Sequence, residues 1–153
     1  MKAYSLLIVT FLILSNTNCT SQNKTEINKN NLTNTTQKSK IEKIELKEQT
    51  RGTRRITTFS PGLKIFSLNE TVTHSPLSVD DWKRISEQAG QIELSTISNL
   101  KAPTSSRFTD AALASSISIT SDGKVYTSST FDSGVPPKEL EKLYKEIITN
   151  NNK

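Results

Sequence analysis

Two residue types that often carry chemistry occur only once each in this chain of 153 residues: cysteine, as Cys19, and histidine, as His74. A disulfide within the chain needs two cysteines, and a zinc site built from cysteine and histidine needs more ligands than are present. A catalytic group of the Ser-His-Asp or Cys-His type would have to use His74. That residue precedes Ser75-Pro76 in a predicted turn, so we expect it to be exposed and predict a protein that is not an enzyme.

Three charged residues in the C-terminal half form the candidate ligand loop: Arg107, Asp110 and Asp132. Two carboxylates beside an arginine could coordinate a cation or clamp a ligand. The preferred interpretation is structural, with an internal ion pair and a turn at Asp132-Ser-Gly that connects a strand to a helix. Because the spacing of a calcium-binding loop is missing, we predict no metal and no cofactor.

The elements that must position these residues begin at Ile41, where apolar and polar side chains start to alternate. Arg51-Gly52 is a plausible hairpin turn, and Ser60-Pro61-Gly62 is the next break. Further strands are predicted over 63–68 and 71–74. If Arg51-Gly52 forms the loop, three cross-strand pairs follow: Glu48 with Arg55, Leu46 with Thr57, and Ile44 with Phe59.

The first helix is predicted after Ser75-Pro76, with Ser78 as its N-cap, Asp81 completing a capping box and Gly90 as its stop. Residues 92–100 predict a turn or a short helical piece, and residues 101–112 a loop. Strands over 113–120 and 124–131 flank Asp122-Gly123, a strong hairpin signal that pairs Ile119 with Tyr126 and Ile117 with Ser128. The last helix follows Pro136-Pro137, with Pro137 at its first position.

Strands, helix, strands and helix in this order predict an α+β fold: an antiparallel sheet of two hairpin or meander units, with both helices packed on one face. The sequence therefore predicts a single α+β domain over residues 41–149 and a short tail over 150–153.

Residues 1–18 are interpreted as a signal peptide of the lipoprotein type. Lys2 precedes a nine-residue segment, Leu6–Leu14, that is apolar except for Thr10. This length is typical of a signal peptide and too short to span a bilayer of about 30 Å. Cys19 follows at the polar end, as in bacterial lipoprotein signals, in which the cysteine becomes the first mature residue and carries the lipid, palmitate included. The alternative is general cleavage that releases a soluble secreted protein with a free thiol.

Residues 19–40 predict a disordered tether, rich in Asn, Thr and Lys, because they contain too little apolar surface to fold. The formal net charge of the chain is +5, and residues 20–60 hold nine basic residues against four acidic ones. Export and the lack of aromatic residues among these charges argue against a nucleic-acid partner.

A set of motifs in the C-terminal half resembles a family of small exported proteins of unknown function found in Bacteroidetes. These motifs are KAPT (101–104), Arg107, Asp110-Ala111, Tyr126-Thr-Ser-Ser and Phe131-Asp-Ser-Gly-Val-Pro-Pro. The family has Gly where Ala111 stands and His where Ser133 stands. The resemblance covers roughly residues 50–149 and implies a fold and an envelope location, but no activity.

The function predicted from the sequence is therefore that of a cell-envelope lipoprotein, anchored in the membrane through its N-terminal lipid. Its domain is expected to be a non-catalytic binding or structural module with an envelope protein or a glycan as partner. The alternative is a secreted or periplasmic hydrolase or ligand-sensing protein that uses Arg107, Asp110 and Asp132.

Overall fold

The computed structural model describes residues 40–152, and the predicted signal peptide, Cys19 and almost the whole predicted tether lie outside these residues. Seven strands form one sheet in the order β4-β3-β2-β1-β5-β6, and the short β7 pairs with β5 beyond the end of β6. Every pair of neighbouring strands is antiparallel. The strands are β1 (Ile41–Thr50), β2 (Thr53–Ser60), β3 (Leu63–Leu68), β4 (Thr71–Pro76), β5 (Ala114–Ser121), β6 (Lys124–Thr127) and β7 (Phe131–Asp132).

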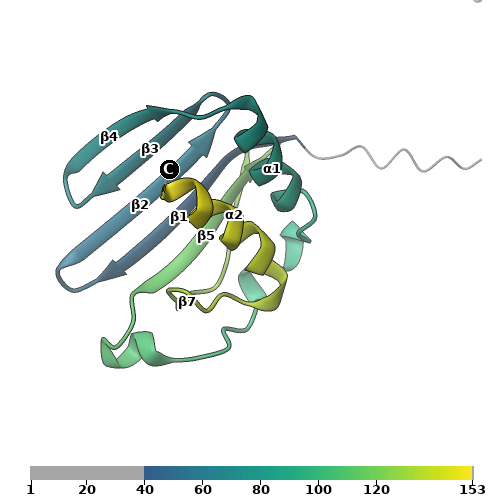
Figure 1. Ribbon diagram of the computed structural model, residues 1–153. Coiled ribbons are helices and arrows are strands. Elements are labelled where there is room, and N and C mark those ends of the chain that lie inside the picture. Colours follow the sequence, from purple (N-terminus) through teal and green to yellow (C-terminus); the bar gives the residue numbers. More distant parts are fainter. Residues whose placement is uncertain (1–39, 153) are drawn as a thin grey trace, which may run out of the picture. The chain divides into compact units, whose positions relative to one another are not determined.

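Two α-helices, α1 (Val79–Ala89) and α2 (Glu141–Asn151), lie over the same face of the sheet (Figure 1). Three short 3-10 helices complete the layer and its connections: η1 (Leu94–Asn99), η2 (Ser106–Thr109) and η3 (Lys138–Leu140). The α+β fold with an antiparallel sheet, predicted from the sequence, is confirmed.

The register of the first hairpin is the predicted one: Ile44 opposes Phe59, Leu46 opposes Thr57, and Glu48 opposes Arg55. Period-two alternation sends Ile44 and Leu46 to the helix-covered face, where they are buried. Ile117 and Ile119 of β5 stand beside them on the same face. The core is therefore the space between the central strands and the two helices. Its largest buried side chains are Phe59, Phe131, Ile44, Leu46, Ile85, Ile97, Ile117, Ile119, Leu140, Leu143 and Ile147.

Helix α1 begins at the predicted cap. The Ser78 hydroxyl accepts a hydrogen bond from the Asp81 backbone N–H at 3.0 Å, and Gly90 is the C-cap. The single tryptophan, Trp82, packs half-buried against the core from this helix. The predicted helical piece over 92–100 is η1, which buries Ile97.

Three boundaries differ from the prediction. Strand β4 continues through Ser75 and Pro76 because it is an edge strand, where a proline costs no ladder hydrogen bond. The strand predicted over 124–131 is split. After Thr127 the Ser128 hydroxyl takes the place of a backbone acceptor for the Ile117 N–H at 3.0 Å.

The third difference lies at the C-terminal end. The predicted last helix starts as η3, with Pro137 at its N-cap, before α2 begins. Helix α2 then runs to Asn151, two residues past the domain boundary predicted at 149. Asn150 is buried, and its carbonyl accepts a hydrogen bond from Lys64 Nζ of β3 at 2.8 Å. This bond ties the last helical turn to the sheet.

Candidate binding site

The structure brings two of the three predicted loop residues together. Asp132 of β7 is buried, and its Oδ1 accepts hydrogen bonds from the Arg107 backbone N–H and from Arg107 Nη1, both at 3.0 Å. Its Oδ2 accepts from the Thr104 hydroxyl and from the Ser106 backbone N–H, both at 2.6 Å. A carboxylate has about four acceptor positions, so these donors occupy all of them.

The electrostatics of Asp132 agree with a structural role. Burial alone would raise the pKa of this carboxyl, but the hydrogen bonds from Thr104, Arg107 and Ser106 outweigh it and hold the pKa far below its usual range. The chain then turns at once, because the Val135 N–H donates to the Asp132 carbonyl at 2.8 Å and Gly134 has a φ of 86°. Asp132 thus clamps the loop over 104–107 to the start of the turn and has no lone pair left for a cation.

Asp110 does not join this pair. Its backbone is left-handed, with φ 57°, and its carboxylate lies 3.7 Å from Arg51 Nε at the tip of the first hairpin. Both side chains are well exposed. Among residues 40–152, no group of three or more His, Cys, Asp and Glu side chains could hold a metal ion. His74 is exposed in β4, opposite Ile65.

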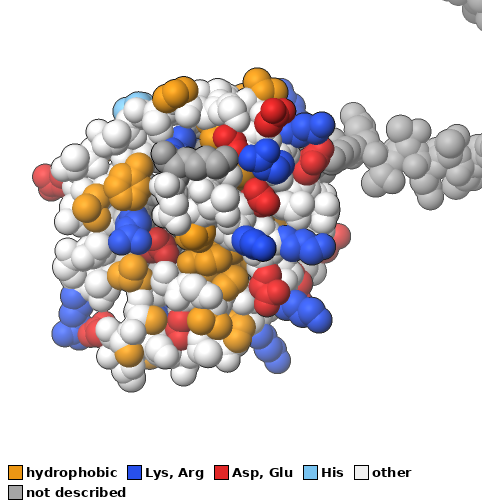
Figure 2. All heavy atoms as spheres, viewed as in Figure 1, with side chains coloured by type: hydrophobic (Ala, Val, Ile, Leu, Met, Phe, Trp, Pro, Cys, Tyr) orange, Lys and Arg blue, Asp and Glu red, His pale blue; other side chains and the backbone are white. Residues whose placement is uncertain are grey.

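A site that the sequence analysis did not single out lies between α2 and the sheet. It is an open hollow of about 390 Å³. Figure 2 shows apolar, basic and acidic side chains meeting beside α2, over the part of the sheet next to this helix. We call it the Glu48 hollow. Its lining comes from β1, β2, β3, the turn after β7, and one side of α2 with the residue that follows it: Glu48, Arg55, Phe66, Leu68, Ser133, Tyr144, Ile148, Asn151 and Asn152.

A cross-strand ion pair lies at the base of the Glu48 hollow. Arg55 Nη1 donates to Glu48 Oε2 at 3.2 Å. The Glu48 side chain is only 3% exposed, whereas that of Arg55 is 41% exposed. The other carboxylate oxygen accepts from the Ser133 hydroxyl at 2.5 Å and from the Ser115 hydroxyl at 3.5 Å. These donors hold the carboxylate in one orientation, and the arginine keeps donors for a further partner.

Tyr144 of α2 forms a rigid wall of the hollow. Its ring meets Phe131 edge to face, with centroids 5.8 Å apart, and its hydroxyl accepts from the Gly134 N–H at 2.9 Å. Both contacts tie α2 to the turn that carries Ser133. The opposite wall is apolar, with Phe66 half-buried and Leu68 exposed on β3.

A signal for this site was present in the sequence. Glu48 is in phase with Ile44 and Leu46, so the alternation places a carboxylate on the face that is otherwise apolar. The predicted register also placed Arg55 opposite it. What no local pattern could supply was α2, which covers Glu48 from a segment nearly one hundred residues away in the chain.

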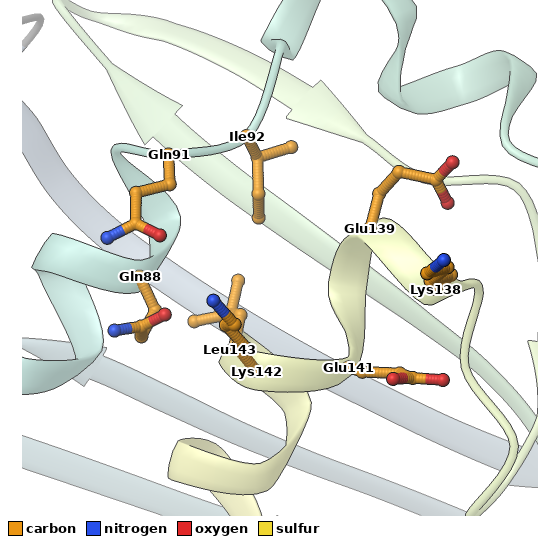
Figure 3. A pocket seen from close by; sticks show the side chains of 8 residues that line it. All are labelled: Gln88, Gln91, Ile92, Lys138, Glu139, Glu141, Lys142 and Leu143. Carbon is orange, nitrogen blue, oxygen red and sulfur yellow. The ribbon is translucent and has the colours of Figure 1, made fainter.

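A second hollow, of about 530 Å³, lies between the end of α1 and the start of α2. Figure 3 shows Gln88 and Gln91 on one side, while Glu139 and Glu141 point away from them on the other. Its remaining lining residues are Ile92, Lys138, Lys142 and Leu143. Because the polar groups do not converge, this hollow is the weaker candidate for a binding site.

Comparison with protein-family models, with curated proteins and with solved structures finds no match for this chain. Between residues 40 and 152, neither α-helix has the length and apolar character needed to cross a membrane.

Proposed function

We propose that the protein is a cell-envelope lipoprotein whose domain is a non-catalytic binding module, and that the Glu48 hollow is its ligand-binding site. The observation that carries the proposal is the convergence of charged, amide, hydroxyl and apolar side chains from five segments on one concave surface. Such a combination of apolar walls with a few fixed polar groups is typical of ligand sites.

Binding is favoured over hydrolysis because the groups of the hollow that could react, Glu48 and Ser133, are hydrogen-bonded to each other. The Ser133 hydroxyl donates to the Glu48 carboxylate, and that carboxylate is already paired with Arg55, so neither group is free to act on a substrate as nucleophile or base. The single histidine cannot serve, because His74 alternates to the other face of the sheet from Phe66 of the hollow. The alternative enzyme based on Arg107, Asp110 and Asp132 has no structural support, since Asp110 lies apart and Asp132 is saturated.

The location in this proposal rests on the sequence. The segment Leu6–Leu14 followed by Cys19 supports export and lipid attachment, which would anchor the domain in a membrane of the envelope. The partner would then be an envelope protein or glycan, and not a nucleic acid.

The test uses the full chain with Cys19→Ser, which removes the acyl acceptor, and measures co-sedimentation with isolated envelope glycan and with envelope protein. Leu68→Trp should fill the exposed rim of the hollow and abolish binding. Val72→Trp is the matched control, because Val72 is also exposed on an adjacent strand but faces the other side of the sheet. Equal binding by Leu68→Trp and Val72→Trp would overturn the proposal. So would a failure of the protein with Cys19→Ser alone to bind either envelope fraction.

A further inference from the structure

The charges that line the Glu48 hollow cancel. Glu48 and Arg55 carry opposite formal charges and pair with each other, and the other seven lining residues within 40–152 are neutral. An anionic ligand could use the spare donors of Arg55 but would meet the carboxylate beside them. A cationic ligand would meet the guanidinium in the same way. The charge balance therefore matches a ligand without net charge.

The hydrogen-bonding groups of the hollow include both donors and acceptors. Within the described part of the chain, Arg55 uses one of its five N–H donors on Glu48, and Glu48 Oε2 accepts a single hydrogen bond, from Arg55. Asn151 Oδ1 is buried beside the hollow, and it has no hydrogen-bond partner among residues 40–152. A hydroxyl group both donates and accepts, so a ligand with several hydroxyls can pair with donors and with acceptors of such a site.

The apolar surface of the hollow is large enough to contact a small ligand but too small for the centre of a protein interface. Among residues 40–152, Leu68 is the only strongly exposed large apolar side chain that lines the hollow. A stable protein partner needs about 800 Å² of surface on each side, with an apolar centre. Phe66, Leu68 and Ile148 instead present a short apolar strip against which the C–H groups of a ring could pack.

From these observations we propose that the Glu48 hollow binds a neutral, polyhydroxylated ligand, namely a segment of an uncharged glycan. This inference rests on the proposed function and names the ligand class of the same site. The volume of about 390 Å³ lies within the range of small-molecule sites. Because the hollow is open, it can hold a few sugar rings of a longer glycan.

The experiment measures binding of oligosaccharide trimers to the full chain with Cys19→Ser by calorimetric titration. Neutral probes are the trimer of N-acetylglucosamine, maltotriose and cellotriose; charged probes are the trimers of galacturonic acid and of glucosamine. We expect at least one neutral trimer to bind at least tenfold more tightly than either charged one. Phe66→Leu and Asn151→Asp should each weaken this binding at least fivefold, whereas Val72→Thr should leave it unchanged.

Two controls keep the outcomes distinct. Thermal melting of each variant shows that the fold is retained, and the two hollow variants are assessed separately, so that loss of one fold does not remove the test. Tighter binding of a charged trimer, no binding of any neutral trimer, or an equal effect of Val72→Thr overturns the inference. If envelope protein binds at the hollow while every glycan fails, the proposed function stands and only the ligand class is wrong.

Discussion

Arg55→Ala should destabilise the fold although the arginine itself is substantially exposed. The change leaves the Glu48 carboxylate, 3% exposed, with hydrogen bonds from the Ser133 and Ser115 hydroxyls and no positively charged partner among residues 40–152. Removing one partner of a fully buried pair costs about 3–5 kcal/mol, and exposed pairs contribute less than about 1 kcal/mol. Because one side of this pair is buried and the other is 41% exposed, we expect a loss of about 2 kcal/mol in the free energy of unfolding.

The double variant provides the sharper test. We expect it to be more stable than Arg55→Ala alone, whereas simple addition of two losses would make it less stable. Glu48→Gln keeps the shape of the side chain and removes the charge that Arg55→Ala leaves uncompensated. Adding Glu48→Gln to Arg55→Ala should therefore restore about 1 kcal/mol and not remove more. The fluorescence of Trp82, the only tryptophan, reports unfolding in urea. If the double variant is as unstable as the sum of the two single variants, the carboxylate is not held by this pair and the reasoning fails.

The remaining predictions concern the loop, its exposed neighbour and the N-terminus. The folded-state pKa of Asp132 lies below its ordinary value of 3.8, so its stabilisation is present above about pH 4 and is lost as the pH falls below that value. Wild-type melting temperature should thus drop more between about pH 6 and about pH 3 than that of Asp132→Asn; equal drops would contradict the saturated network. Asp110→Asn should change the unfolding free energy by less than about 1 kcal/mol in urea titrations, because its ion pair is exposed, and a larger loss would show an unseen role. Cys19→Ser should move the protein from the detergent phase to the aqueous phase in a lipoprotein-processing host, and mass spectrometry that finds an unmodified thiol on the wild-type protein would refute lipidation.

The fold was predictable because its signals are local. Alternation from Ile41, the turn at Arg51-Gly52 and the cap at Ser78 each specify a neighbour a few residues away, and the structure contains all three. The boundaries that differ depend on distant partners. Lys64 extends α2 by bonding to Asn150, and Ser128 ends β6 by bonding to Ile117.

The candidate site was only half predictable for the same reason. Residue type identified Arg107 and Asp132 as chemically capable, but the four donors on Asp132 come from a loop whose path no periodic pattern encodes. For Glu48 the sequence predicts a strand position opposite Arg55 and nothing more. Its burial comes from α2 and from the turn at Ser133, which fold over it from the far end of the chain.

The central claim is that a ligand of the envelope binds in the Glu48 hollow. The most direct measurement is a chemical-shift map of the full chain with Cys19→Ser, recorded while an oligosaccharide or envelope fraction that binds is added. The largest shifts should fall on Phe66, Leu68, Ile148 and Asn151, with the Arg107–Asp132 loop unaffected. Shifts that centre on Arg107 and Asp132, or on the uncovered face of the sheet around Val72, would contradict the account.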